Sequence, residues 1–297
     1  MVDKDKLLNI LKKYWGYSDF RLDQEKIIRT ILANQDLLAL LPTGGGKSLC
    51  YQIPTLYKNK PCLVVSPLIA LMQDQVNDLL SRNIPAIYLS GNILYEEFTQ
   101  FKTAALQMKY LFIFISPERL QSKMFYDFFQ KMDWGLFAID EAHCISLFGQ
   151  DFRPSYLELK LLKNTFPNTP VLAVTASATN KVQQEIISFL KLQNHTIVQS
   201  SFLRPNLSFS CFDVAIKLNK IFDIMKVVKG TGIIYCSTQA ACEFVAYQLV
   251  QNGFNADYYH AGLNKDSREK KLINWLQDKI TTMVCTNAFG MGINKLA

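Results

Sequence analysis

The sequence predicts an α/β protein built on a parallel sheet with helices on both faces, and the pattern and share of apolar residues carry this prediction. Short apolar runs bounded by turn residues recur along nearly the whole chain, with amphipathic stretches between most of them. Runs that are apolar throughout are typical of strands buried on both faces of a parallel sheet. Hydrophobic residues make up 49% of the 297 residues and charged residues 19%, which indicates a well-cored globular protein.

The apolar runs that fit buried strands are spread over both halves of the chain. In chain order they are residues 36–41, 61–66, 85–89, 110–115, 134–140, 171–175, 232–236, 256–260 and 282–286. Helices are expected between most of these runs. The helix after residues 61–66 is expected to begin with Ser66 as its N-cap and Pro67 in its first position.

The best domain boundary lies at residues 200–206, where a proline and polar residues interrupt the alternation of strands and helices. This boundary predicts a first domain over residues 1–205 and a second piece over residues 206–297. The second piece is short for a complete parallel-sheet domain, because ordinary domains have about 100 to 150 residues.

The composition excludes several classes of protein. No apolar run approaches the roughly 18 residues that suggest a membrane span, and the charged start of the chain lacks a signal-peptide core. A cytoplasmic, nucleoid-associated protein without a membrane partner is therefore expected. The seven cysteines are scattered and form no CxxC pair, which favours free thiols in a reducing compartment and predicts no zinc site.

The formal net charge of +7 and the pI near 8.9 permit a polyanionic partner without requiring one. A basic run occupies residues 265–271. We interpret this run as the solvated face of a helix. The expected buried side of that helix consists of Leu272, Ile273, Trp275 and Leu276. A nucleic-acid-binding patch is the alternative interpretation.

A glycine-rich turn between an expected strand and an expected helix indicates a phosphate-binding loop. The three glycines at 44–46 can adopt backbone angles closed to other residues, so that successive N–H groups converge on phosphate oxygens at a helix N-terminus. Lys47 is then expected to reach the β- and γ-phosphates, and Ser48 to bind Mg²⁺. Leu41 stands where the usual pattern has its first glycine, so a flexible turn with a chance lysine is the alternative.

Two adjacent carboxylates, Asp140 and Glu141, follow the apolar run at 134–140. Because parallel strands present functional residues at their carboxyl ends, these acids and the Lys47 loop can meet at one edge of the sheet. Asp140 is expected to hold Mg²⁺, directly or through water, and Glu141 to orient the water that attacks the γ-phosphate. Two adjacent acids alone more often begin a helix. Beside a phosphate loop they indicate phosphoryl transfer, which needs positioning and charge stabilisation rather than a covalent nucleophile.

Over almost the entire chain, short motifs resemble, in order, those of superfamily 2 helicases and specifically those of the RecQ family of DNA helicases. The resembling segments are GYSDFRLDQ (16–24), LPTGGGKSLCYQIP (41–54), SPLIALMQDQV (66–76), ISPERL (115–120), IDEAHCISLFGQDFRPSY (139–156), VTASAT (174–179), GIIYCST (232–238), YHAGL (259–263) and VCTNAFGMGINK (284–295). Each motif is weak alone, but together and in register they are highly specific. SLCYQIP, DEAHCIS, DFRP and AFGMGI distinguish this pattern from that of the DEAD-box RNA helicases.

The resemblance implies a RecA-like domain that begins with an adenine-reading segment over residues 1–33, followed by an incomplete second RecA-like domain. It implies an ATP-dependent 3′–5′ DNA helicase of repair and recombination, with ATP and Mg²⁺ as cofactors and single-stranded and branched DNA as partners. Protein partners are not indicated.

The resemblance also assigns roles to individual residues. For ATP binding it implies Tyr17, which stacks on the base, together with Arg21, Gln24, Thr43, Gly44, Gly45, Gly46, Lys47 and Ser48. For catalysis it implies Lys47, Asp140, Glu141 and His143, with Ser48 and Asp140 as the magnesium ligands. His143 is expected to connect the acids to the VTASAT segment.

The aromatic-rich loop after the acids is the segment that the resemblance assigns to sensing DNA. Phe148, Phe152 and Arg153 are expected to meet unstacked bases and the nucleic-acid backbone. Aromatic faces accept any base and arginine adds charge, which suits sequence-independent binding of a single strand. A place in the core is the alternative for these aromatic residues, and for Tyr156 and Leu157 we prefer it.

The chain departs from the RecQ pattern at four positions. In the aromatic-rich loop Phe148 replaces a tryptophan, Leu147 a glutamine and Gln150 a histidine; in the VTASAT segment Ser177 replaces a threonine. A phenyl ring still stacks, but over less area. The missing histidine is expected to loosen the coupling between the two sites.

The RecQ pattern also continues with a motif VI, whose arginines stabilise the charge of the γ-phosphate, and this motif has no counterpart before Ala297. Loss of an arginine finger costs other phosphate-cleaving enzymes on the order of 10³-fold or more in rate. This chain is therefore expected to bind ATP and DNA but to hydrolyse ATP slowly. Two alternatives stay open, namely an RNA-stimulated ATPase and a non-catalytic nucleic-acid-binding remnant.

Overall fold

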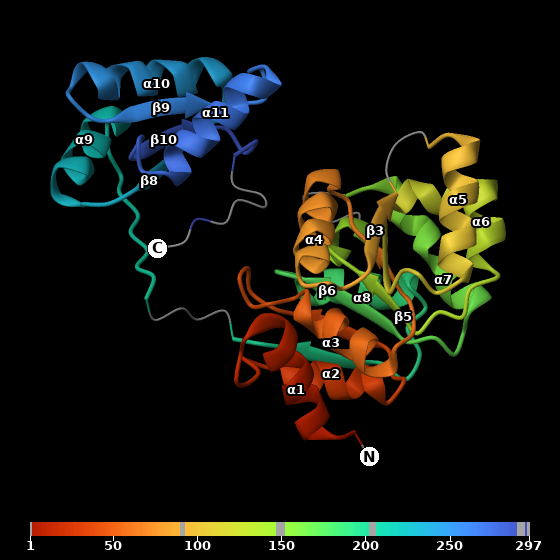
Figure 1. Cartoon of the computed structure of the whole chain (residues 1–297). Coiled ribbons are helices and arrows are strands. Elements are labelled where there is room, and N and C mark those ends of the chain that lie inside the picture. Colours follow the sequence, from red (N-terminus) through yellow and green to blue (C-terminus); the bar gives the residue numbers. More distant parts are fainter. Residues whose placement is uncertain (1, 90–92, 147–151, 202–205, 290–294, 296–297) are drawn as a thin grey trace. The chain divides into compact units, whose positions relative to one another are not determined.

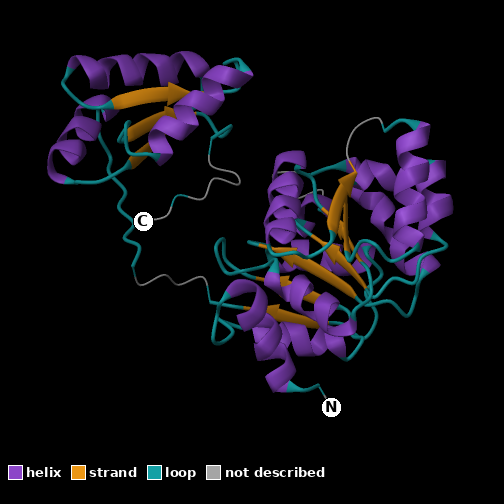
Figure 2. Cartoon of the chain, in the orientation of Figure 1, coloured by secondary structure: helices purple, strands orange, loops and turns teal. Residues whose placement is uncertain are grey.

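The computed structural model describes residues 2–89, 93–146, 152–201, 206–289 and 295. The chain divides into two compact units, Met1–Arg204 and Pro205–Ala297. Each unit consists of a parallel sheet with helices packed against it, which confirms the predicted fold class (Figures 1 and 2). Within the described residues, no helix is both long enough and apolar enough to cross a membrane.

A parallel sheet of seven described strands forms the centre of the first unit. The strands lie in the order β3-β4-β2-β5-β6-β1-β7, and neighbouring strands run parallel. They are β1 (Leu37–Leu40), β2 (Cys62–Val65), β3 (Ala86–Leu89), β4 (Phe112–Ile115), β5 (Leu136–Ile139), β6 (Val171–Thr175) and β7 (Thr196–Gln199). Every residue of β1, β2, β4, β5 and β6 is buried, because helices cover both faces of the sheet.

Alternate side chains of each strand enter two separate cores, one on each face. Leu37 and Ala39 pack with helices α2 (Gln24–Leu32), α3 (Leu49–Lys58) and α4 (Ile69–Ser81). Leu38 and Leu40 face the opposite core. That core is covered by α5 (Tyr95–Leu106), α6 (Lys123–Phe129), α7 (Lys160–Thr165) and α8 (Asn180–Phe189). Helix α1 (Lys4–Trp15) packs outside α2 and α3 through Leu7 and Leu11.

The second unit repeats the same design with fewer elements. Its described strands form a parallel sheet in the order β8-β10-β9. The elements are α9 (Lys217–Val227), β8 (Gly232–Tyr235), α10 (Gln239–Gln251), β9 (Ala256–Tyr259), α11 (Lys265–Leu276) and β10 (Thr282–Cys285). Two clusters of buried side chains, one around Leu249 and one around Trp275, give this unit its own core.

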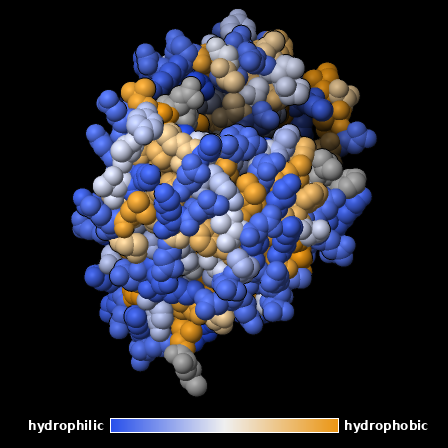
Figure 3. Space-filling model, turned by 90° about the vertical axis from the view of Figure 1, so that its right-hand side faces the viewer, coloured by the Kyte–Doolittle hydropathy of each residue, from blue (hydrophilic) through white to orange (hydrophobic). Residues whose placement is uncertain are grey.

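The molecular surface is mainly hydrophilic where Figure 3 shows it. On that face the hydrophobic residues are scattered in small groups among hydrophilic ones. Scattered apolar residues of this kind are normal on a globular protein and do not mark a binding site by themselves.

Two details of the predicted elements are wrong. Strand β7 was not predicted, because its buried face consists of Val198 alone and the strand carries no apolar run. Helix α4 begins at Ile69 with Leu68 as its N-cap, and not at Pro67 after Ser66. The Ser66 N–H still belongs to the sheet, where it donates to the carbonyl oxygen of Ile115 at 3.0 Å, and its hydroxyl makes no capping hydrogen bond in the described part of the chain.

The predicted buried side of α11 is also only partly correct. Trp275 is 5% exposed, but Ile273 is 43% and Leu276 37% exposed. Ile273 lies two residues before Trp275, roughly 200° around the helix, so the two side chains cannot share one buried face. The cysteines are free thiols, and Cys211 is exposed whereas Cys236 is partly buried.

Candidate nucleotide and nucleic-acid site

Three adjacent strands of the first sheet carry the predicted site residues to one edge. Strands β5, β6 and β1 are neighbours and run parallel, so their carboxyl ends lie side by side. Asp140 follows β5, Thr175 ends β6, and the glycine-rich turn follows β1. The N–H of Asp140 donates to the carbonyl oxygen of Val65 at 2.8 Å. This sheet hydrogen bond fixes the backbone position of Asp140 at the end of β5.

The glycine-rich turn requires glycine at its tight points. Gly44 and Gly46 have φ angles of +76° and +71°, in the left-handed region that other side chains disfavour. A Cβ atom at Gly45 would lie 2.8 Å from the carbonyl oxygen of Pro42, and one at Gly46 would lie 2.3 Å from Nε2 of Gln24. A glycine turn at the N-terminus of the ten-residue helix α3 fits a phosphate group, because glycines have no side chains that would keep a phosphate from the backbone.

Lys47, Glu141 and His143 form one connected polar group. Lys47 Nζ lies 3.5 Å from Glu141 Oε1, and His143 Nδ1 lies 3.4 Å from Glu141 Oε2. The same histidine nitrogen lies 2.9 Å from the hydroxyl oxygen of Thr175. This hydroxyl in turn donates to the carbonyl oxygen of Ser177 at 3.2 Å. The structure thus joins β1, β5 and β6 through side chains at their carboxyl ends.

The backbone of Glu141 adopts a left-handed conformation, with φ 47° and ψ 47°. For a residue with a side chain this conformation costs about 1–2 kcal/mol. The neighbouring hydrogen bonds hold it in place, because the Glu141 N–H donates to Asp140 Oδ1 at 3.0 Å and the Glu141 carbonyl accepts from Cys144 at 2.9 Å. Strain of this kind at a strand end is typical of functional positions.

Asp140 is half-buried, as Glu141 is, but its carboxyl is the more strongly perturbed of the two. Burial raises the pKa of Asp140 to about 6, the neighbouring charge of Glu141 adds to this increase, and Lys47 opposes it. The hydroxyl of Tyr156, a residue buried in the core as expected, donates to the main-chain carbonyl of Asp140 at 3.0 Å. The carboxylate is therefore held with little hydration, an environment in which a cation has a strong effect.

Ser48 and Asp140 are the residues that could hold a magnesium ion. Ser48 is half-buried at the start of α3, on the same side of the sheet as the glycine-rich turn. A hydroxyl and a carboxylate are hard oxygen ligands, which Mg²⁺ combines with phosphate oxygens and water. Among the described residues, no group of three or more histidine, cysteine, aspartate or glutamate side chains could hold a metal by itself. A magnesium ion held by Ser48 and Asp140 would need further ligands, such as phosphate oxygens or water.

The residues expected to read adenine lie next to the glycine-rich turn. Tyr17 is 45% exposed, and the Arg21 guanidinium carbon lies 5.3 Å from the centre of its ring. Gln24 is buried, and its side-chain Nε2 donates to the carbonyl oxygens of Gly45 and Gly46 at 3.1 and 3.3 Å. The Arg21 N–H donates to Gln24 Oε1 at 3.0 Å. Gln24 thus connects this segment to the phosphate cradle.

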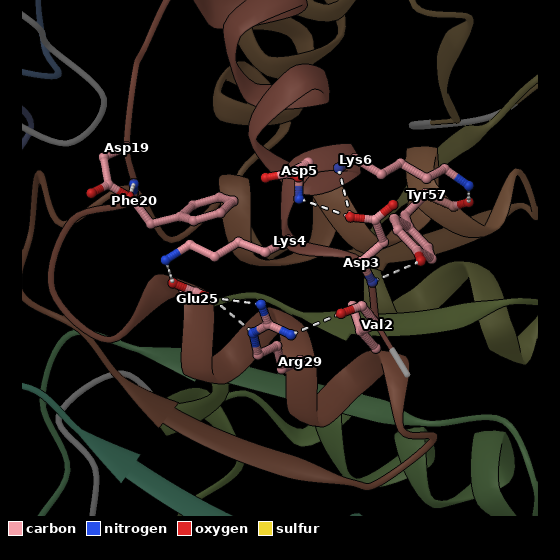
Figure 4. A network of polar contacts seen from close by, with 10 residues as sticks. All are labelled: Val2, Asp3, Lys4, Asp5, Lys6, Asp19, Phe20, Glu25, Arg29 and Tyr57. Carbon is pink, nitrogen blue, oxygen red and sulfur yellow. Dashed lines mark hydrogen bonds and ion pairs between the residues drawn. The ribbon is translucent and has the colours of Figure 1, made fainter.

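Helix α1 braces the helix that carries Gln24 (Figure 4). Glu25 of α2 lies 3.4 Å from Lys4 and 2.8 Å from Arg29. Arg29 Nη1 also donates to the carbonyl oxygen of Val2 at 3.1 Å. These contacts join the start of the chain, at Val2 and Lys4, to the helix that carries Gln24.

The predicted DNA-contacting loop is only partly visible. Phe148, like the departures at Leu147 and Gln150, lies outside the described residues. Phe152 and Arg153 are half-buried. Arg153 Nη1 donates to the carbonyl oxygen of Pro67 at 2.8 Å. The structure therefore places this arginine between the acid motif and the start of α4, rather than free in solvent.

Comparison with known proteins identifies the family. A family model described as DEAD/DEAH box helicase matches residues 21–186, which is more than half of the chain. The chain belongs to the DEAD/DEAH box helicase family. A second model, described as helicase conserved C-terminal domain, matches residues 214–295 of this helicase.

Individual relatives confirm the resemblance to RecQ helicases. This helicase is 39% identical over 293 residues to a protein of Pasteurella multocida named ATP-dependent DNA helicase RecQ, with 98% of the chain and 46% of the relative covered. It is 40% identical over 299 residues to a protein of Acanthamoeba polyphaga mimivirus named putative ATP-dependent RNA helicase R290, with 98% and 53% covered. The chain spans about half the length of the curated relatives it matches.

A solved structure shows the same fold. The DUF1998 helicase MrfA, crystallised with DNA and AMPPNP, matches with a TM-score of 0.74 and 16% identity, over 99% of this chain and 45% of the other. At 16% identity the match is evidence for the fold alone. It agrees with the tandem parallel sheets of this helicase.

Sequence reasoning left two groups at the site unnamed. One is Thr175, the residue of the VTASAT segment through which His143 makes the expected connection between the acids and that segment. The other is the main-chain carbonyl of Pro67, which holds Arg153. No side-chain pattern could have indicated a carbonyl group.

Proposed function

We propose that the chain is the motor part of an ATP-dependent DNA helicase of the RecQ type, which couples ATP hydrolysis to 3′–5′ movement along single-stranded DNA and to unwinding. The observation that carries this proposal is the connected group of Lys47, Glu141, His143 and Thr175 beside the glycine-rich turn. Nucleotide hydrolysis needs a phosphate cradle, a cation, and an acid that can orient water, and this edge of the sheet holds candidates for all three.

Each residue has a distinct part in the proposed reaction. The glycine-rich turn and Lys47 hold the phosphates, and Ser48 and Asp140 hold Mg²⁺. The bound ion supplies charge stabilisation for the phosphate oxygens. Glu141 orients and polarises the attacking water, and His143 fixes the position of Glu141 through its contact with Thr175. The exposed ring of Tyr17 stacks on the base of the bound nucleotide.

The coupling to DNA is proposed to run through the loop that follows the acids. Its described end contacts the acid motif through Tyr156, which donates to the carbonyl of Asp140, and contacts the segment before α4 through Arg153, which donates to Pro67. A single strand that binds Phe152 and Arg153 would shift these contacts and thereby the acids. We propose single-stranded and branched DNA of repair and recombination as the substrates, which makes the protein nucleoid-associated.

An RNA-stimulated ATPase is the second candidate, because a relative named as a putative RNA helicase is as similar to the chain as the DNA helicases are. Phosphate release from ATP, measured without polynucleotide, with single-stranded DNA and with RNA of the same sequence, separates the two. We expect DNA to stimulate turnover more than RNA. Stimulation by RNA alone would support the second candidate.

Binding of Mg²⁺-ATP tests the nucleotide site independently of turnover. Lys47→Ala is expected to weaken binding by roughly 100-fold, because it removes the cation that meets the phosphates. Lys60→Ala is the matched control, since Lys60 pairs at the surface with Asp133 at 2.7 Å, away from the site. Equal affinity of both variants and the original protein would contradict the proposed site.

A further inference from the structure

Asp23 stands at the N-cap position of α2, but its carboxylate makes no capping hydrogen bond to that helix. Aspartate is a preferred N-cap residue because its oxygen usually accepts from the first turn. Here Asp23 Oδ2 instead accepts a hydrogen bond of 2.5 Å from the hydroxyl of Ser200, 177 positions further along the chain. The Asp23 carboxylate thus accepts from Ser200 and does not cap α2.

Ser200, the residue that donates to Asp23, is buried and bonded to the sheet. It follows β7, is 2% exposed, and its N–H donates to the carbonyl oxygen of Leu40 at 3.0 Å. Leu40 ends β1, the strand that leads into the glycine-rich turn. A short hydrogen bond to a charged acceptor is stronger than one between neutral groups. Asp23 is therefore tied to the same sheet edge from which the phosphate cradle begins.

The neighbour of Asp23 makes this tie relevant to nucleotide binding. Gln24 follows directly and donates to the carbonyl oxygens of Gly45 and Gly46. Within residues 17–24 the described hydrogen bonds are local: the Arg21 N–H donates to Gln24 Oε1, the Gln24 N–H donates to the carbonyl oxygen of Arg21 at 3.1 Å, and the Phe20 N–H donates to Asp19. The contact of Asp23 with Ser200 adds a tie to the sheet directly before Gln24, the first residue of α2.

We propose that Asp23 and Ser200 are positioning residues, which hold Gln24 and the adenine-reading segment against the phosphate cradle and thereby set the preference for adenine over other bases. This inference rests on the proposed nucleotide site. Asp23 and Ser200 act through Gln24 and are not assigned a contact with the nucleotide. Substitution of Asp23 or Ser200 is expected to weaken the contribution of the base to nucleotide affinity. The contribution of the phosphates is expected to stay the same.

The test measures dissociation constants of the 297-residue chain for Mg²⁺-ATP, Mg²⁺-GTP and Mg²⁺-tripolyphosphate. In Ser200→Ala, affinity for ATP is expected to fall about tenfold, whereas affinities for GTP and tripolyphosphate stay within about twofold. Asp23→Asn is also expected to lower the affinity for ATP, because asparagine keeps an acceptor oxygen but lacks the negative charge. Ser200→Thr keeps the hydroxyl and is expected to restore the preference for ATP.

Ser155→Ala is the matched control, because Ser155 also donates to a carboxylate, that of Glu118 at 2.7 Å, outside the adenine-reading segment. Its ratio of ATP to GTP affinity is expected to equal that of the original protein. An unchanged ratio in both Ser200→Ala and Asp23→Asn would overturn the inference, and so would an equal loss for ATP and tripolyphosphate. Failure of the original protein to bind any of the three ligands would instead overturn the proposed nucleotide site.

Discussion

Asp140 and Glu141 are adjacent in the sequence but lie in different surroundings, and this difference separates their proposed roles. Asp140 is half-buried, and the desolvation of its carboxyl raises its pKa to about 6. The Glu141 side chain is 25% exposed and lies between Lys47 and His143. Two acids whose surroundings differ in this way can divide the work of holding a cation and orienting water.

The raised pKa of Asp140 predicts a pH-dependent stability of the metal-free protein. Because the folded-state pKa of about 6 exceeds the ordinary value of 3.8, the folded state binds this proton more tightly than the unfolded state. The stabilising effect is complete below pH 3.8 and is lost as the pH rises through 6. Relative to Asp140→Asn, the free energy of unfolding is expected to fall by up to about 3 kcal/mol between pH 4 and 7.

Urea unfolding of both proteins in a chelating buffer measures this difference. The relevant quantity is the free energy of unfolding of the original protein minus that of the variant at each pH. A difference that stays constant or grows with pH would show that Asp140 does not titrate with a raised pKa.

The sequence predicted which kinds of residue form the site, namely glycines, a lysine and two acids. It did not predict most of the residues to which they are hydrogen-bonded. Consecutive glycines before Lys47 restrict the possible backbone, and a strand that ends in two acids restricts the possible chemistry. The contact of Gln24 with Gly45 and that of Thr175 with His143 join segments far apart in the chain. Such pairs depend on how the segments fold together, which residue spacing alone does not reveal.

Three strands of the first sheet are joined at the edge opposite to the site by one buried ion pair. Asp36 precedes β1, and its Oδ1 accepts from Lys163 Nζ at 3.0 Å and from the N–H of Val171 at 2.9 Å. Its Oδ2 accepts from the N–H of Gln193 at 2.7 Å, and its carbonyl oxygen accepts from Thr196 at 3.0 Å. The carboxylate therefore holds β1, β6 and β7 in their relative positions.

Lys163→Met is expected to destabilise the first unit by about 3–5 kcal/mol, because it leaves the buried charge of Asp36 without its cation. A second substitution, Asp36→Asn, is expected to recover part of this loss by removing the charge. Lys60→Met, which breaks an exposed pair with Asp133, is the control and is expected to change stability by less than about 0.5 kcal/mol. Chemical unfolding measures all three. A loss in Lys163→Met no larger than in the control would contradict this role.

The sequence was informative about buried strands and less so about element ends. The apolar runs at 171–175 and 282–286 coincide with β6 and β10 to within one residue, because strands buried on both faces must be apolar throughout. Strand β7 was not predicted, because most of its residues are at least partly exposed and its hydrophobic pattern is weak. Helix α4 starts three residues after Ser66, whose N–H still belongs to the sheet, so the residue type of Ser66 did not locate the N-cap.

The two units have separate cores, so each has the means to fold by itself. The buried clusters of the first unit contain residues of that unit, and the same holds for the clusters around Leu249 and Trp275 in the second. Tandem units of this kind are also what the two matched family models indicate.

Leu249→Ala is therefore expected to destabilise the second unit by about 2–5 kcal/mol, because Leu249 is fully buried on α10. Calorimetry is expected to show two transitions, of which the substitution lowers one and leaves the other in place. Affinity for Mg²⁺-ATP is expected to stay unchanged, since the proposed nucleotide site belongs to the first unit. A single transition that shifts as a whole would show that the units unfold together.

The proposed link between nucleotide hydrolysis and DNA binding depends on Glu141, so turnover in Glu141→Gln tests it most directly. Phosphate release is measured at saturating Mg²⁺-ATP, with and without single-stranded DNA, alongside nucleotide and DNA affinity. DNA is expected to raise turnover of the original protein about tenfold or more, and Glu141→Gln is expected to lose roughly 100-fold of the stimulated rate while both affinities are kept. Full stimulated turnover in Glu141→Gln would contradict the proposed mechanism.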